Sequence, residues 1–219
     1  MLWSPNTQLL YPFENTALDY SGNARHGTVF GSGVYATKPN GGRCLYFDGV
    51  GDYVATPSFG LSGTVVVFAA FIRSRLVGAT QGIYQQGAIS ATVGHLLLYR
   101  RNSNYDLAYR YANGASPEFI TASNFFLACD DQWVSLLVAG DYTGKKCYFY
   151  RGGLPFYTGS FSGTPVFPSA ASATTGLADG APLVGYLANV QLWTLPTCPP
   201  VGVLTANANR LMLGMNPIW

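Results

Sequence analysis

The sequence predicts an all-β protein: a two-sheet antiparallel sandwich of the jelly-roll type, with a short C-terminal helix and an extended tail. Composition is the first reason. Aromatic residues make up 15% of the 219 residues and charged residues only 10%, a balance that suits sheets better than solvent-facing helices. The second reason is that short runs with apolar residues at alternate positions recur along the chain. The third is that Gly, Pro, Asn and Asp interrupt these runs at intervals of roughly 8–12 residues.

The segment Gly42–Val54 shows this pattern most clearly. Leu45 and Phe47 are placed to share one face of a strand, with different residues between them. Glycines then break the run around Asp48 and Asp52, because glycine permits the positive φ of a tight turn. The segment is therefore predicted to form a strand, an acidic turn and a second strand.

The same signals predict the other strands. They fall at residues 9–13, 26–29, 65–72, 82–87, 94–100, 105–111, 119–121, 133–139, 144–151, 154–158 and 182–193. Residues 160–180 are rich in Ser, Thr, Gly, Ala and Pro, and this composition predicts loops.

The end of the chain has a different pattern. Leu204, Ala208 and Leu211 recur at helical spacing, which predicts a helix of about two turns. Thr205 is the candidate N-cap, and Gly214 is placed to end the helix. We therefore divide the chain into a jelly-roll domain, residues 1–200, and a C-terminal helix with an apolar tail, residues 201–219.

Charge and apolar patterning exclude two kinds of partner. The net charge of +2 is too small for the basic patch of a nucleic-acid-binding domain, and no apolar run approaches the ~18 residues of a membrane span. The N-terminal segment lacks the basic start and long apolar run of a secretion signal. Cys44, Cys129, Cys147 and Cys198 include no C-x-x-C pair, so we expect no zinc site. Three disulfide pairings are open, but the apolar settings favour free thiols.

Landmarks in a fixed order carry a resemblance to a known family. They are Asp19–Asn23 (DYSGN), His26–Thr28 (HGT), Gly42–Val54, Asp131–Val134 (DQWV), Gly144–Gly152 (GKKCYFYRG) and Val184–Trp193 (VGYLANVQLW). Together they resemble the laminin-G-like, or concanavalin A-like, jelly-roll family over residues 7–195. The resemblance implies the fold. It implies no single function, because the fold serves sugar binding, protein binding and plain structure.

The closing segment Asn207–Trp219 is similar to the ends of laminin-G-like domains in tailed-phage virion proteins. This similarity implies a non-enzymatic virion structural protein: a capsid decoration, head-fibre or tail-appendage subunit. It would reside in the virion after synthesis in the host cytoplasm. The implied partners are other virion proteins, further copies of the chain and a cell-surface glycan. Trp3, Ile218 and Trp219 are the candidate assembly residues, because apolar ends need a partner to cover them. The alternative is a carbohydrate-binding module of a cell-surface or secreted protein.

Catalysis is not predicted. A retaining glycoside hydrolase needs two carboxylates roughly 5–5.5 Å apart, and the two glutamates, Glu14 and Glu118, form no E-x-D-x-E spacing. The two histidines, His26 and His95, lie in no nucleophile motif. We expect both to make structural hydrogen bonds. A hydrolase is the most distant of the possible functions.

Turn residues supply one candidate metal site and no other cofactor site. The candidate calcium ligands are Asp19, Asn23, Asp48 and Asp52. Calcium prefers carboxylate, amide and carbonyl oxygens on turns. Related domains often add an acidic pair from the closing strand, where this chain has Ala188 and Asn189. The alternative is that the aspartates cap their own turns.

Tyrosines on one predicted strand form a candidate glycan site. Tyr105, Tyr109 and Tyr111 are placed on one face of that strand, and Arg110 lies among them in the sequence. Sugar faces stack on exposed aromatic rings beside polar groups, so we name these four residues as the candidate ligand-binding set. The alternative is that this face is the core of the sandwich.

Overall fold

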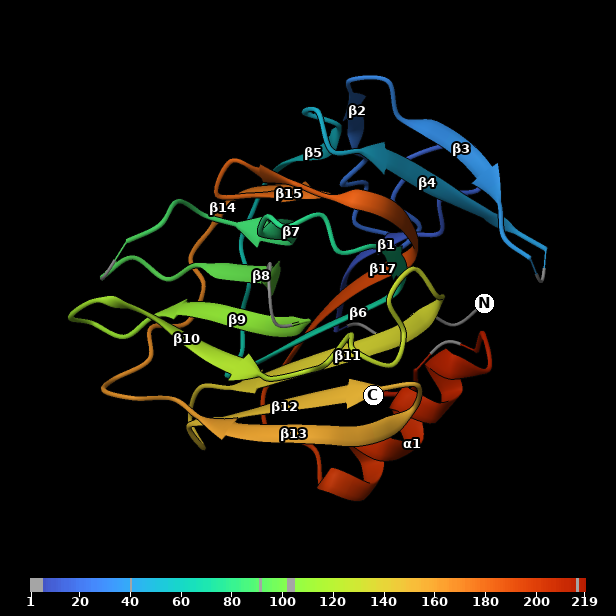
Figure 1. The fold of residues 1–219 in the computed structure, drawn as a ribbon. Coiled ribbons are helices and arrows are strands. Elements are labelled where there is room, and N and C mark those ends of the chain that lie inside the picture. The colour runs from blue at the N-terminus through green and yellow to red at the C-terminus, as the bar shows by residue number, and fades with distance from the viewer. Residues whose placement is uncertain (1–5, 40, 91, 102–104, 216) are drawn as a thin grey trace.

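Two antiparallel sheets face one another in the computed structural model, and one helix lies outside them (Figure 1). The structure describes residues 6–39, 41–90, 92–101, 105–215 and 217–219. The predicted fold class, an antiparallel β-sandwich with a C-terminal helix, is confirmed.

The larger sheet has eight strands. Its order is β13 (Leu154–Ser160), β12 (Lys146–Arg151), β11 (Val134–Asp141), β6 (Val65–Ser74), β17 (Val184–Leu195), β4 (Arg43–Asp48) and β3 (Val34–Thr37), with β1 (Thr7–Tyr11) paired to β17. The apolar run predicted at residues 65–72 lies in β6, near the middle of this sheet. That position explains its near-continuous apolar character. One face meets the core and the other is partly covered by the helix.

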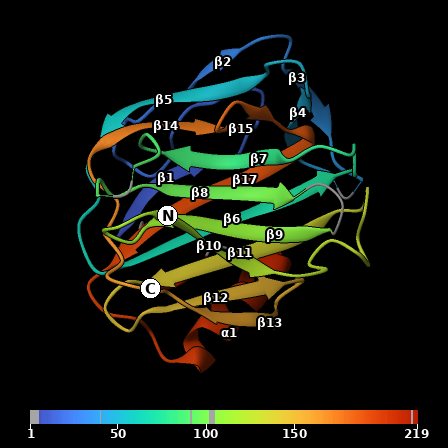
Figure 2. The ribbon, with the colours of Figure 1, turned by 60° about the vertical axis from the view of Figure 1, so that its left-hand side comes forward.

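The smaller sheet has seven strands, several of which are stacked in order in Figure 2. Its order is β10 (Pro117–Ala122), β9 (Asp106–Ala112), β8 (Leu96–Arg101), β7 (Gln81–Gln86), β14 (Ala171–Thr175), β5 (Tyr53–Phe59) and β2 (Thr28–Phe30). A short ribbon of β15 (Leu177–Ala178) and β16 (Ala181–Pro182) lies against β7. Gly82 permits this close approach, because a Cβ at Gly82 would collide with the backbone of Ala178.

The prediction of loops over residues 160–180 is wrong at residues 171–175, which form strand β14. Ala173, Thr174 and Thr175 pair with β7 on one side and β5 on the other. Small side chains suit this central position, where Ala173 and Thr175 are buried. The strand is held by backbone hydrogen bonds to two neighbours and has no apolar run of its own.

The main core fills the space between the sheets. Phe68 of β6 meets Tyr84 of β7 across it, with ring centroids 5.2 Å apart, and both side chains are buried. Leu45 and Phe47 of β4 also face this core, as the alternation of Gly42–Val54 predicted. Burial of such large side chains is the main source of the stability of a sandwich.

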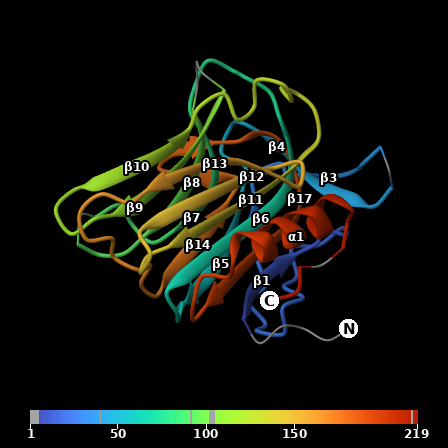
Figure 3. The same cartoon turned by 90° about the horizontal axis from the view of Figure 1, so that it is seen from below.

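Helix α1 (Val201–Met212) lies against the eight-stranded sheet (Figure 3). A second core fills the space between them. Leu204, Ala208 and Leu211 are the buried helical residues, as their spacing predicted. The predicted N-cap is wrong: the helix begins at Val201, four residues before Thr205. Thr205 lies inside the helix and donates a hydrogen bond to the Val201 carbonyl oxygen. Among the described residues, no helix is long and apolar enough to span a membrane.

Candidate functional site

Helix α1 covers part of the outer face of the eight-stranded sheet and leaves an aromatic part of that face accessible. The outward residues of β6 show the division. Val65, Val67 and Ala69 are buried in the helix-side core, whereas Phe71 and Arg73 are only half-buried. The uncovered part of the sheet is therefore the place where side chains of four strands can meet a ligand.

Strand register assembles a row of aromatic rings on this uncovered face. Tyr186 of β17 lies between Tyr46 of β4 and Arg73 of β6 in the hydrogen-bonded ladder. Trp133, just before β11, lies at the end of the row. Its ring centroid is 6.1 Å from that of Tyr186, which is 4.8 Å from that of Tyr46. We call Trp133, Tyr186 and Tyr46 the aromatic row, and all three are half-buried.

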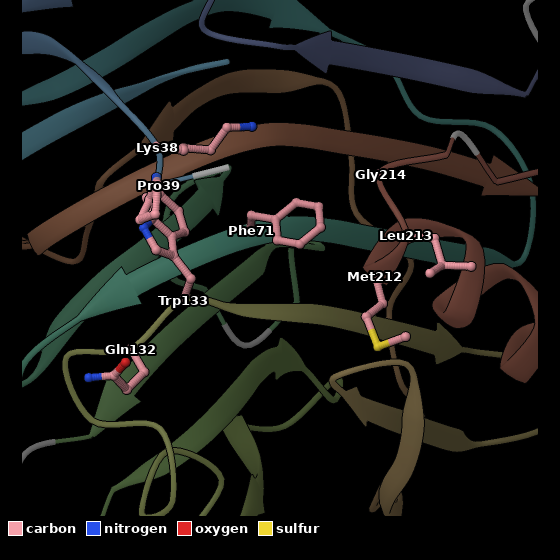
Figure 4. Close-up of a pocket in the computed structure, with 8 residues that line it drawn as sticks. All are labelled: Lys38, Pro39, Phe71, Gln132, Trp133, Met212, Leu213 and Gly214. Carbon is pink, nitrogen blue, oxygen red and sulfur yellow. The ribbon is translucent and has the colours of Figure 1, made fainter. Parts of the chain in front are cut away.

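A pocket of about 460 Å³ adjoins the Trp133 end of the row (Figure 4). Its lining residues are Lys38, Pro39, Phe71, Gln132, Trp133, Met212, Leu213 and Gly214. In Figure 4 the Phe71 ring lies between Trp133 and Pro39 on one side and Met212 and Leu213 on the other. The ammonium group of Lys38 is 6.0 Å from the centroid of the Phe71 ring. We call this cavity the Phe71 pocket. It combines apolar walls with two polar side chains.

A smaller pocket of about 170 Å³ adjoins the other part of the row. Arg73 donates from Nε to Asp131 Oδ1 at 3.0 Å, and its guanidinium carbon is 5.6 Å from the centroid of the Tyr186 ring. The Arg73 guanidinium lowers the pKa of Asp131, so this carboxylate stays ionised at neutral pH. A donor and an acceptor are thus held beside exposed aromatic surface.

This arrangement suits a ligand with flat apolar faces and hydroxyl edges. Aromatic rings offer large contact area at a small cost in conformational entropy. Lys38, Gln132 and the Arg73–Asp131 pair supply hydrogen-bond donors and acceptors along the rim. A sugar ring presents both kinds of surface.

The predicted glycan set does not form such a site. Tyr109 and Tyr111 do share a face, but that face is the core, where each is about 1% exposed. Tyr109 Oη and Tyr142 Oη are hydrogen-bonded at 2.8 Å, and Tyr105 packs half-buried against the same core. Arg110 points to the other face and forms an ion pair with Asp179. The prediction of an exposed tyrosine platform is wrong, and the alternative of a core face holds.

The predicted calcium ligands act as turn anchors in this structure. Asp19 accepts hydrogen bonds from the backbone N–H groups of Leu10, Ser21 and Arg25. Asp52, in a different turn, accepts from Ser32 and Asp48. The candidate set is thus divided between two turns. The remaining two members are engaged as well. Asn23 donates to the Thr7 carbonyl oxygen, and Asp48 accepts from the Val50 N–H. Within the described ranges, no three His, Cys, Asp or Glu side chains gather as a metal site.

The two described candidate assembly residues, Ile218 and Trp219, lie in different settings. Trp3 lies outside the described residues. Trp219 packs edge-on against Trp193 of its own chain, with ring centroids 5.6 Å apart, so its ring does not need a neighbouring subunit to cover it. The Asn207 side chain holds this tail by hydrogen bonds to both the N–H and the carbonyl oxygen of Ile218. The Ile218 side chain is 65% exposed and uncovered.

Among the described residues, neither histidine ring is hydrogen-bonded to a serine, threonine or cysteine side chain. His26 Nδ1 accepts a hydrogen bond from the Asp19 N–H at 3.1 Å, and His95 Nδ1 accepts one from the Ser90 N–H at 3.5 Å. Both contacts are of the structural kind that the sequence predicts. All four cysteines have free thiols, and burial raises the pKa of Cys44, Cys129 and Cys147, which disfavours reactive thiolates.

Sequence reasoning missed the aromatic row. Asp131–Val134 was used as a landmark of the fold, and Tyr46 and Tyr186 were used as strand residues. A signal was present, because a half-exposed face of a strand that carries Trp or Tyr is a binding candidate. Only the register of β4, β17 and β6 brings these distant positions together.

Comparison with known proteins identifies the fold. No protein-family model matches the chain, and no curated protein matches it by sequence. Domain 4 of AbnA, a GH43 extracellular arabinanase from Geobacillus stearothermophilus solved in complex with arabinotriose, superposes with a TM-score of 0.73. Their sequence identity is 16%, over 94% of this chain and 98% of that domain. The binding domain of botulinum neurotoxin serotype D superposes with a TM-score of 0.68 at 10% identity, over 95% of this chain and 52% of that one. The chain thus spans about half the length of the toxin domain.

Proposed function

We propose that this protein is a non-enzymatic carbohydrate-binding module and that the sugar stacks on the aromatic row beside the Phe71 pocket. The observation that carries the proposal is the accessible row of Trp133, Tyr186 and Tyr46, bordered by the Arg73–Asp131 pair. The arabinotriose complex of a domain with the same fold supports this choice of ligand class, as does the prevalence of binding domains among the similar structures.

The test is a glycan-array screen that includes arabinotriose, followed by calorimetric titration of the sugars that bind. Trp133→Ala is expected to weaken binding by about tenfold or more, the loss typical of one well-packed aromatic anchor. Tyr20→Ala is the matched control, because Tyr20 is an exposed ring outside the site. Thermal melting must show that both variants are folded. The proposal fails if no glycan binds, or if both variants bind as well as the wild type.

A second candidate function is a virion structural protein of a tailed phage, a capsid decoration, head-fibre or tail-appendage subunit that uses the fold for assembly. The observation that favours it is apolar exposure on the helix and tail. Exposed apolar side chains there are Val201, Val203, Met212, Leu213, Met215 and Ile218. They lie at the two ends of α1 and along the tail, and exposed large apolar side chains that gather on a surface commonly mark an interaction site. In this role the partners are other virion proteins and further copies of the chain, and the location is the virion.

The two functions are separated by copurification and light scattering. A virion subunit is expected to copurify with particles at fixed stoichiometry and to lose incorporation when residues 215–219 are deleted. A monodisperse monomer whose tail deletion leaves incorporation unchanged would exclude the assembly role. The glycan titrations above are independent of that result.

A further inference from the structure

A small pocket lies on the outer face of the seven-stranded sheet, on the opposite side of the molecule from the aromatic row. Its volume is about 230 Å³. The lining residues are Thr80, Tyr99, Arg101, Phe119, Asp179 and Ala181. Strands β8 and β10 supply Tyr99, Arg101 and Phe119, while the turn of the β15–β16 ribbon supplies Asp179. We call this cavity the Tyr99 pocket.

Two guanidinium groups flank Phe119, the exposed aromatic ring that lines the Tyr99 pocket. The guanidinium carbons of Arg101 and Arg110 are each 5.1 Å from the centroid of the Phe119 ring. Arg110 donates from Nη1 to Asp179 Oδ2 at 3.0 Å, so these two charges offset one another. Arg101 has no ion-pair partner among the described residues. The pocket therefore carries one uncompensated positive charge.

The buried Tyr99 hydroxyl gives a second indication of a ligand. Tyr99 is 3% exposed, and no group meets hydrogen-bonding geometry with its buried hydroxyl in the described structure, although Arg110 and Asp179 lie beside it. A buried hydroxyl without a partner costs free energy, so such groups are rare unless a ligand or water engages them. Burial is the main cause that raises the pKa of Tyr99 to about 12, while the neighbouring Arg110 opposes the rise and Asp179 adds to it. The phenol is a protonated donor at neutral pH. The Nε of Arg110 is likewise buried and unpartnered.

We propose that the Tyr99 pocket binds the carboxylate of an acidic sugar residue of the uronate type. The carboxylate would accept hydrogen bonds from Arg101 and from the Tyr99 hydroxyl. A monoanion balances the one uncompensated charge, and charge-assisted hydrogen bonds to arginine are among the strongest in proteins. The volume lies below the roughly 300–1,000 Å³ typical of drug-sized ligands, which fits a single ring. That the carboxylate belongs to a sugar rests on the proposed carbohydrate-binding function.

The experiment is an NMR titration of the full chain with glucuronate, glucose and acetate, following the Nε–H resonances of the arginines. Glucuronate is expected to shift the Arg101 and Arg110 resonances. Glucose lacks the carboxylate and acetate lacks the ring, so both are expected to bind at least tenfold more weakly. If glucose matches glucuronate, the carboxylate is not recognised. If acetate matches it, the sugar is not recognised. Either result overturns the proposal.

Variants separate this pocket from general charge effects. Tyr99→Phe and Arg101→Gln are each expected to weaken glucuronate binding by about tenfold, the equivalent of one good hydrogen bond. Lys146→Gln, which removes an exposed positive charge from β12 of the other sheet, is the matched control and is expected to bind normally. Tyr99→Phe keeps the ring and removes an unpartnered hydroxyl, so its melting temperature should not fall. Normal glucuronate binding by both pocket variants would overturn the proposal. If the glucuronate proposal failed in this way, a loss of neutral-sugar binding in Trp133→Ala would still support the proposed carbohydrate-binding function.

Discussion

The imidazole of His95 is buried at the start of β8, where a charged form would be poorly solvated. Its Nδ1 accepts from the Ser90 N–H, and its Nε2 has no partner among the described residues. Burial lowers the pKa of His95 below its ordinary 6.5, and the nearby Arg110 adds to this effect, while the Val93 backbone and Asp179 partly oppose it. The folded protein therefore favours neutral His95.

This pKa shift predicts a pH-dependent loss of stability. As pH falls through 6.5, the unfolded chain binds a proton that the folded chain excludes, so the free energy of unfolding decreases. Melting temperatures measured between pH 8 and pH 5 should fall more steeply for the wild type than for His95→Gln. His26→Gln is the control, because His26 is exposed. Parallel curves for wild type and His95→Gln would contradict the assignment.

The buried carboxylate of Asp52 predicts a loss of stability when it is replaced by an amide. It is 2% exposed and accepts the Ser32 N–H at 2.6 Å and the Asp48 N–H at 3.0 Å, one on each oxygen. Asp52→Asn keeps the shape but places an amide NH₂ against one of these donors. We expect it to lower the free energy of unfolding by about 1.5–3 kcal/mol in urea titrations. Asp48→Asn, in the same turn but half-buried, should cost about 0.5 kcal/mol or less. Equal losses would show that burial of Asp52 is not decisive.

The same hydrogen bonds predict a weak response to calcium. The oxygens of Asp19 and Asp52 already accept backbone N–H groups, and a cation would have to displace those donors. Millimolar calcium is therefore expected to leave the melting temperature unchanged relative to a sample in chelator. A clear rise with calcium would mean that a cation binds the folded state and would restore the metal-site prediction.

At the scale of elements, helix α1 is predicted to stabilise the sandwich and not merely to follow it. Leu204 is completely buried against the outer face of the eight-stranded sheet, whereas the adjacent Val203 is 42% exposed. Leu204→Ala should lower the free energy of unfolding by about 2–4 kcal/mol, because it opens a cavity in the second core. Val203→Ala should change it by about 0.5 kcal/mol or less. A two-state urea transition measured for both variants decides this, and similar values would mean that the helix packs loosely.

The elements that the sequence predicts correctly are those whose signal is local. Leu45 and Phe47 face the core because alternation places them there, and the α1 residues are buried at the spacing their sequence shows. Strand β14 was missed because Ala173 and Thr175 carry no such signal and become strand only between two neighbours. Alternation placed Tyr109 on one face of β9, but it does not say which face is the core.

The candidate site is less predictable than the fold for a related reason. Tyr46 and Tyr186 lie far apart in the sequence and meet only through the pairing of β4 with β17. The Arg73–Asp131 pair likewise depends on how β6 lies beside β11. The composition shows that the chain has many aromatic residues. Only tertiary register decides which of them remain accessible.

At the scale of the whole molecule, the sandwich places two chemically different regions on opposite outer faces. The aromatic row lies on the eight-stranded sheet and the uncompensated Arg101 charge on the seven-stranded sheet. The packed core between them is about 10 Å thick in such folds, so the two regions share no side chain. A sandwich core is rigid, and ligands at separate rigid sites influence one another little.

This separation predicts that the two ligands bind independently. Saturation with glucuronate should change the dissociation constant of a neutral oligosaccharide, such as arabinotriose, by less than about twofold, a coupling free energy near zero. Calorimetric titrations of each ligand in the presence and absence of the other measure that coupling. Trp133→Ala should weaken neutral-sugar binding alone, and Arg101→Gln should weaken glucuronate binding alone, so that the double variant shows both losses without interaction. Competition between the two ligands would contradict this prediction, because it would require that both occupy one site on one face of the sandwich.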